Sequence, residues 1–245
     1  MSRGMHQFKG LFSILLFLLF IPHFAFSDSE SDSIERSDQK AHQKWNDFDQ
    51  GLSLHVRRIF KGTSSSQKNN LSPGLRKNYE EYRVLRDEVL FWDQVLDLKK
   101  EILKLPANGP VSPPESEERM REAGEIAKAI IPAFGELKQK YHMIRPAGLH
   151  NILVNMGLKK EGFCWHWTRD LRGRLLGLDL REFNLLWATA YEGKLREHNT
   201  LVIVSKGMGL SDGLLLDGWR NSGTPFWTRI STDHYPWKLG EYKGS

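Results

Sequence analysis

Three residues in the C-terminal third have the types and the order that nucleophilic catalysis by sulfur requires. Cys164, the only cysteine among 245 residues, lies in GFCWHW directly before an amphipathic segment. His198 opens a strand-like segment further along the chain, and Asp217 closes the next one. A thiol becomes a nucleophile when one partner keeps it ionised and a third group holds that partner in place. The order therefore predicts a triad of Cys164 as nucleophile, His198 as base and Asp217 as orienting acid.

The spacing of apolar residues predicts the helix or strand on which each member of this triad lies. Apolar residues at helical spacing surround the cysteine: Phe163, Trp167, Leu171 and Leu175. Cys164 then falls in the first turn of a helix, where unpaired backbone N–H groups favour a thiolate. Strand alternation places His198 on the face opposite Leu201, and Asp217 shares a face with Leu215. If the two strands are neighbours, the imidazole can lie between the sulfur and the carboxylate.

Acyl transfer also needs hydrogen-bond donors for the oxyanion that forms on the attacked carbonyl. The backbone N–H groups at Cys164 and Trp165 are candidates, and Asn151, Asn155 and Tyr191 are candidates among the side chains. Asn221 is a further candidate for shaping the pocket, or it belongs to a plain turn. We expect His166 to point away from the nucleophile and to have a surface or core role.

A cysteine at a helix start, followed by histidine and aspartate on successive antiparallel strands, resembles the transglutaminase-like branch of the papain-like cysteine peptidase superfamily. The matching segments are GFCWHW, EHNTLVIV and LLLDGWR, so the resemblance covers only the C-terminal third. It implies acyl-thioester chemistry with the three roles given above. The sequence departs from the family pattern after the histidine, where Asn199 and Thr200 replace an aromatic residue, and at Gly218, where proline is frequent.

The N-terminus has the pattern of a secretory signal peptide. Arg3 and Lys9 precede an apolar run over residues 11–26, and Ala25 and Ser27 provide small residues for cleavage. Pro22 interrupts the run before it reaches the roughly 20 apolar residues of a membrane span. We therefore expect residues 1–27 to be removed and the protein to be exported to the periplasm or cell envelope. The alternative is an uncleaved segment that anchors the chain in the membrane.

Composition excludes several classes of function. Loss of the two basic residues in 1–27 lowers the net charge from +5 to +3, and no basic stripe with interleaved aromatics suggests nucleic-acid binding. One cysteine cannot form an internal disulfide. The scattered histidines lack the paired spacing of a metal centre such as HExxH, so we expect no metal and no cofactor.

The remaining sequence divides into four regions. Residues 28–40 are polar and acidic and predict a disordered lead-in, whereas 41–105 predicts helices over 41–60 and 75–105. Residues 106–115, PANGPVSPPE, predict a linker. Residues 116–245 predict the catalytic domain. The fold class is therefore α+β, with N-terminal helices followed by an antiparallel sheet packed on the nucleophile-bearing helix, as in the papain-like and transglutaminase-like core.

Two functions fit these observations. The first is an exported, cysteine-dependent amide hydrolase or acyltransferase that acts on envelope peptides or proteins, cell-wall peptides among them. The second is a non-catalytic envelope module with the same fold that binds a partner. The apolar stripe of residues 75–105 either packs against the body of the domain or provides a surface for a protein partner.

Overall fold

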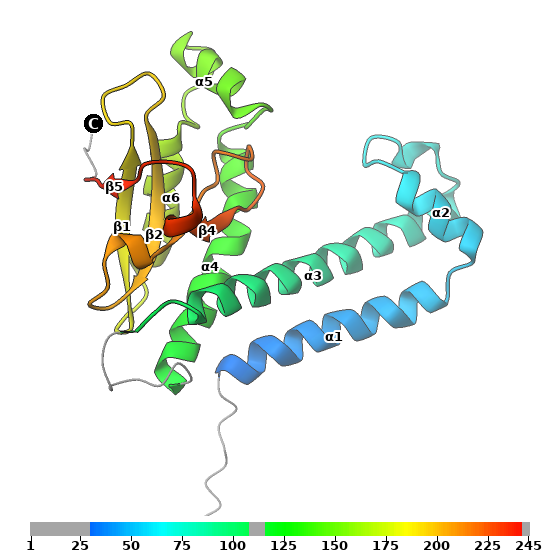
Figure 1. Cartoon of the computed structure of the whole chain (residues 1–245). Coiled ribbons are helices and arrows are strands. Elements are labelled where there is room, and N and C mark those ends of the chain that lie inside the picture. The colour runs from blue at the N-terminus through cyan, green and yellow to red at the C-terminus, as the bar shows by residue number, and fades with distance from the viewer. Residues whose placement is uncertain (1–29, 108–115, 242–245) are drawn as a thin grey trace, which may run out of the picture.

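The computed structural model of the chain describes residues 30–107 and 116–241. In these ranges the fold is α+β, with six α-helices and one five-stranded antiparallel sheet (Figure 1). The helices are α1 (Glu30–Gln50), α2 (Leu54–Gly62), α3 (Pro73–Leu103), α4 (Glu117–Lys140), α5 (Ala147–Asn155) and α6 (Cys164–Leu175). The strands are β1 (Phe183–Ala190), β2 (His198–Ser205), β3 (Leu214–Leu216), β4 (Trp227–Arg229) and β5 (Lys238–Leu239). The expected signal segment 1–27 and most of the expected linker lie outside the described residues.

The first three helices form an arm. Figure 1 shows α1 and α3 side by side, extending away from the sheet, with α2 at their far end. A separate apolar cluster, here named the tip cluster, closes this end around buried Phe60, Tyr79 and Tyr82. Nearer the sheet, Val95, Leu98 and Ile102 of α3 are buried in the main core. The stripe of α3 is thus largely used for packing within the chain.

The expectation of a disordered lead-in over residues 28–40 is wrong from residue 30 onward. Helix α1 begins at Glu30 and continues to Gln50. Ile34 is fully buried, and its side chain lies so close to Gly124 of α4 that a Cβ there would be 2.7 Å from it. The polar composition hid these contacts, because a helix needs only one narrow apolar stripe to pack against its neighbours.

The helix expected over residues 41–60 is divided in two. α1 ends at Gln50, and Ser53 begins α2 by accepting a hydrogen bond from the backbone N–H of Val56 at 3.3 Å. Serine favours such a position because its side-chain oxygen satisfies one of the unpaired N–H groups of a helix start. The turn allows α2 to fold back over the tip cluster.

The main core lies between the helices and one face of the sheet. Helix α4 runs through its centre with Ile126, Ile130 and Phe134 fully buried. Leu171 of α6 and Leu201 of β2 complete the same cluster. Since α6 packs on both α4 and β2, its first residue is held at the edge of the sheet.

The sheet has the order β4-β3-β2-β1-β5. The hairpin of β1 and β2 pairs Ala190 with His198, and β2 pairs with β3 through Val202 and Leu215. The expected neighbourhood of β2 and β3 is therefore confirmed. The strand alternation holds as well, because Leu201 lies in the helix-side core while Val202 and Leu215 lie in a second cluster on the opposite face.

In the part of the chain that the structure describes, no helix is both long and apolar enough to cross a membrane.

Candidate active site

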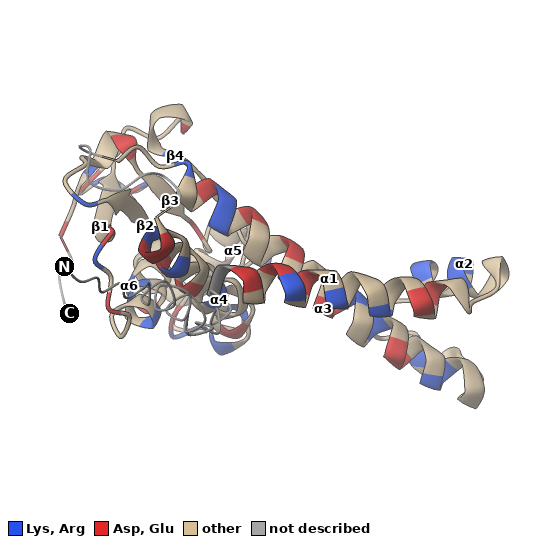
Figure 2. Cartoon of the chain, turned by 90° about the horizontal axis from the view of Figure 1, so that it is seen from below, with Lys and Arg blue, Asp and Glu red and all other residues tan. Residues whose placement is uncertain are grey.

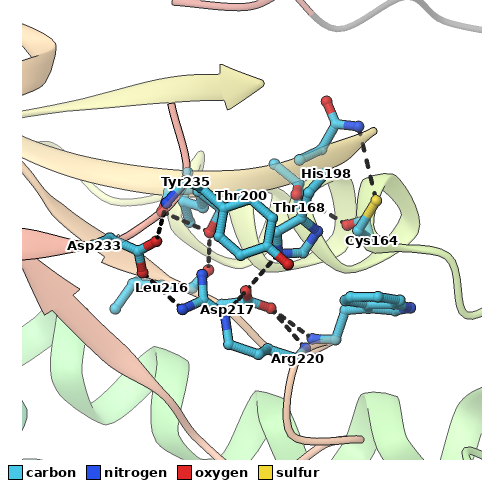
Figure 3. Close-up of polar contacts among 12 residues, drawn as sticks. Cys164, Thr168, His198, Thr200, Leu216, Asp217, Arg220, Asp233 and Tyr235 are labelled. Atoms are coloured by element: carbon cyan, nitrogen blue, oxygen red, sulfur yellow. Dashed lines mark hydrogen bonds and ion pairs between the residues drawn. The ribbon is translucent and has the colours of Figure 1, made fainter. Parts of the chain in front are cut away.

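The structure brings Cys164, His198 and Asp217 together at one end of the sheet. Nε2 of His198 lies 2.7 Å from Oδ2 of Asp217, and both side chains are buried. Figure 3 shows the imidazole between this carboxylate and the sulfur of Cys164. Nδ1, the second ring nitrogen, is buried and has no hydrogen-bond partner of ordinary geometry among the described residues. This nitrogen is the one available to the sulfur.

The charge of His198 follows from its two neighbours. Burial lowers the pKa of an imidazole, but the hydrogen bond to Asp217 and the nearby thiol of Cys164 outweigh burial and raise the pKa of His198 to about 9. Burial likewise raises the pKa of a carboxyl, yet His198 and Arg220 hold the pKa of Asp217 below its ordinary value. At neutral pH the site therefore contains a carboxylate and an imidazolium, which is the cation that a thiolate needs beside it.

Asp217 is held by four hydrogen bonds. Its Oδ1 accepts from the backbone N–H groups of Trp219 and Arg220, both at 2.9 Å. Its Oδ2 accepts from His198 and from Nε of Arg220 at 3.1 Å. Arg220 in turn donates to Asp233 at 2.7 Å and lies against the rings of Phe226 and Tyr235. The carboxylate is thus fixed before it orients the imidazole.

Cys164 is the first residue of α6, and only 7% of its surface is exposed. The backbone carbonyl of Glu197 lies 3.8 Å from Sγ. On another side, the side-chain amide nitrogen of Asn199 lies 3.8 Å from the same sulfur. Because the backbone N–H groups of a first helical turn lack partners within the helix, Cys164 also lies at the positive end of α6.

His166 builds the start of the nucleophile's helix. Its Nδ1 accepts hydrogen bonds from the backbone N–H groups of Phe163 at 3.1 Å and Gly162 at 3.3 Å. Burial and the charge of Arg169 lower the pKa of His166 to about 4, so the ring is neutral and its lone pair is free to accept. Phe163 has no capping oxygen of its own, and His166 supplies the missing acceptor for its N–H. His166 is therefore a structural residue, as expected.

A close approach fixes β3 against α6. Gly218, directly after Asp217, lies over the indole of Trp167, and a Cβ at this position would be 2.1 Å from Cε3 of that ring. Only a residue without a side chain permits the contact. The close contact at Gly218 therefore sets the distance between Asp217, at the end of β3, and Cys164, at the start of α6.

Three aromatic rings surround the imidazole. The ring centroids of Trp219, Tyr235 and Trp237 lie 4.9, 5.0 and 5.4 Å from that of His198. Trp237 directly precedes the short strand β5, which the sequence analysis did not identify. The rings exclude water from the ion pair and thereby strengthen it.

The expected oxyanion donors are only partly at the site. No hydrogen bond to a backbone acceptor satisfies the N–H of Trp165 within the described residues, so this donor stays available beside Cys164. Asn151 reaches the site indirectly, since its Oδ1 accepts from the indole of Trp219 at 3.0 Å. The ring of Tyr191 packs edge-on against that of Tyr235, with ring centroids 6.0 Å apart.

Asn155 and Asn221 are not brought to the sulfur. Asn155 is an exposed residue at the end of α5. Asn221 is exposed in the turn that follows β3, where its backbone carbonyl accepts from the N–H of Thr224. The second reading for Asn221, a plain turn, is therefore the one that the structure supports. Residue type alone could not predict whether the side-chain amide of either asparagine lies near the sulfur.

Asn199 is the neighbour of the sulfur that the sequence analysis missed as a candidate. Its Oδ1 accepts hydrogen bonds from the indole N–H of Trp187 and the hydroxyl of Thr189, both at 2.8 Å. These contacts turn the NH₂ group toward Sγ of Cys164. Strand alternation could have identified Asn199 as a candidate. It places Asn199 on the same face as Leu201, which packs on the helix side of the sheet.

No family model matches this chain, and no curated protein or solved structure matches it significantly.

Proposed function

We propose that this protein is an exported, cysteine-dependent amide hydrolase or acyltransferase with a papain-like, transglutaminase-like core in residues 116–245. One observation carries the proposal: a buried imidazole is hydrogen-bonded to Asp217 on one nitrogen and faces the sulfur of Cys164 on the other side. Few structural roles need all three groups in this arrangement, because a charged pair beside an inert thiol is costly to bury.

The geometry supports a two-step reaction. His198 holds the proton of the thiol, and Sγ of Cys164 attacks the carbonyl carbon of an amide. The oxyanion is stabilised by the N–H of Trp165 and by the side-chain amide of Asn199. His198 then gives its proton to the leaving amine as the C–N bond breaks, leaving a thioester on Cys164. Water releases the acid, or a second amine takes the acyl group.

The substrate class follows from the proposed location. A cleaved segment 1–27 would place the protein in the periplasm or cell envelope, where peptides and proteins, cell-wall peptides included, carry amide bonds. The arm provides a protein-binding surface on the same chain, with Leu54, Val84 and Leu90 among its exposed apolar residues. An uncleaved signal segment would be the one attachment to the membrane.

One observation favours a binding module without catalysis as the alternative. Only 7% of the surface of Cys164 is exposed, which leaves a substrate little access to the sulfur. In a binding module the triad would be part of the core, and the arm would bind the partner.

An acyl-enzyme experiment tests the proposal. The protein is mixed with a p-nitrophenyl ester as an acyl donor, and intact-mass spectrometry follows thioester formation while absorbance follows p-nitrophenol. We expect a burst of about one equivalent and an acyl group on Cys164. His198→Ala should remove the burst. A dansylated amine added afterwards distinguishes transfer from hydrolysis. Absence of acylation in the wild-type chain at all pH values from 5 to 9 would favour the binding module.

A further inference from the structure

A second group of ionisable side chains lies on the arm, remote from the triad in the fold. Asp38 and His42 are one helical turn apart on α1, and Asp93 faces them from α3. Nε2 of His42 lies 2.9 Å from Oδ1 of Asp93 and 3.6 Å from Oδ1 of Asp38. Figure 2 shows the charged residues of these two helices where they run side by side.

The three ligand-type atoms have the spacing of a metal site. All lie within 4.8 Å of one another. Two ligands of a tetrahedral zinc ion, at about 2.1 Å from it, are roughly 3.4 Å apart. The distances of 2.9 and 3.6 Å bracket this value. Only small side-chain adjustments would therefore bring the three atoms onto one ion.

The chemistry of the group favours a cation. Oδ1 of Asp38 is buried and makes no hydrogen bond among the described residues, which is costly for a carboxylate oxygen. Two carboxylates beside one imidazole carry a net negative charge even when the ring is protonated. His42 and Asp93 are each nearly half exposed, so water can reach the ion and complete its coordination.

We propose that Asp38, His42 and Asp93 bind one divalent transition-metal ion, with zinc as the preferred ion. One imidazole nitrogen and two carboxylate oxygens suit zinc, cobalt, nickel or manganese. Calcium and magnesium prefer oxygen ligands alone and are disfavoured. The ion would join α1 to α3, so its role is to hold these two helices of the arm together.

The test uses the tag-free full chain, freed of metal by chelation. Isothermal titration with zinc should give one site per chain at the arm. Zinc should also raise the melting temperature, because a ligand of the native state stabilises it. Cobalt at the same site should give visible absorption bands, whose disappearance on zinc addition shows competition. The titration is repeated with Cys164→Ala, because the triad could itself bind zinc through its thiol.

Matched variants make the assignment specific. Asp93→Asn and His42→Gln should each weaken zinc binding by more than about 100-fold. Loss of a residue that only hydrogen-bonds to a metal ligand typically costs roughly 10–100-fold, and these variants remove a ligand itself. Asp97→Asn, an exposed change one turn further along α3, should leave the affinity unchanged. Zinc binding that survives both ligand variants, or that is lost only in Cys164→Ala, overturns the proposal. So does the absence of binding, which would leave the three residues as an ion-pair group.

Discussion

At the scale of residues, the imidazole of His198 connects the chemistry of the site with the stability of the chain. Its pKa is raised to about 9, above the 6.5 of an unperturbed histidine. A raised pKa means that the charged ring stabilises the fold. This contribution is complete below pH 6.5 and is lost as the pH rises through 9. The pair of His198 with Asp217 therefore contributes most to stability below pH 6.5.

Asp217→Asn tests this linkage. At pH 6 we expect the free energy of unfolding to fall by about 3–5 kcal/mol, the cost of breaking a buried ion pair. The difference from the wild type should shrink between pH 6.5 and 9, because the wild type loses its imidazolium there. Urea unfolding at four pH values measures both effects. Asp179→Asn, in an exposed pair with Arg181, is the control with a change near zero. A difference that stays constant with pH would contradict the account.

Asn199 should contribute to acylation rather than to folding alone. In Asn199→Ala the sulfur loses the amide nitrogen 3.8 Å away. We expect the acylation rate with the p-nitrophenyl ester to fall by about 100-fold, as for other oxyanion donors. Asn184→Ala, at an exposed position of β1, should react like the wild type. Equal acylation rates in Asn199→Ala and the wild type would show that the amide has no role in the chemistry.

The three members of the triad could be predicted from the sequence because each lies at one end of a helix or strand. The apolar residues of that helix or strand recur at a clear helical or strand spacing. Cys164 precedes a helical stripe, and His198 and Asp217 bound β-branched or leucine-rich strands. Arg220 and Asp233 were not predicted as supports of the carboxylate. Their contact joins a turn to a loop 13 residues further along the chain, and no periodicity encodes it.

At the scale of elements, the fold depends on how closely β3 approaches α6. The α+β class, with helices ahead of an antiparallel sheet, and the β1–β2 hairpin could be predicted from periodicity. The separation between the sheet and α6 could not, because it results from the contact of Gly218 with the face of Trp167. In the sequence, Gly218 is a departure from the family pattern; in the fold, it is the residue that this packing requires.

Gly218→Ala should disturb the site through this contact. The added Cβ would overlap the indole, and we expect a loss of about 1–3 kcal/mol in unfolding free energy, as for overpacked cores. Cys164 should also become less reactive, because the strand that carries Asp217 must move away. The matched control is Gly173→Ala in α6, where a Cβ has open space and helix propensity predicts a gain of up to about 1 kcal/mol. A neutral Gly218→Ala would disprove the close approach.

At the scale of the whole molecule, the far end of the arm has an apolar cluster of its own, whereas the near end packs into the main core. The tip cluster of Phe60, Tyr79 and Tyr82 is distinct from the core beneath the sheet. The acidic segment at the start of α1 was predicted to be disordered, since composition does not reveal packing against a distant helix. The body of the molecule positions the triad, and the tip of the arm lies outside that core.

Phe60→Ala should separate these two roles. Replacing a fully buried phenylalanine with alanine typically lowers the free energy of unfolding by about 3–5 kcal/mol. Here we expect the destabilisation to be confined to the tip of the arm. We expect faster hydrogen exchange in α2 and the adjoining ends of α1 and α3, with unchanged exchange in α6 and β2. The acylation rate of Cys164 should be unaffected. A parallel loss of acylation would show that the arm and the site form one cooperative unit.

The most direct test of the account is the pH dependence of alkylation at Cys164. Folded wild type and His198→Ala are treated with iodoacetamide from pH 5 to 9, and intact mass gives the rate. If an imidazolium keeps the sulfur ionised, the wild type should already react readily at pH 6, and His198→Ala should react far more slowly there. A wild-type rate that rises only near pH 8.5, where ordinary thiols ionise, and that matches His198→Ala at pH 6, would contradict the account.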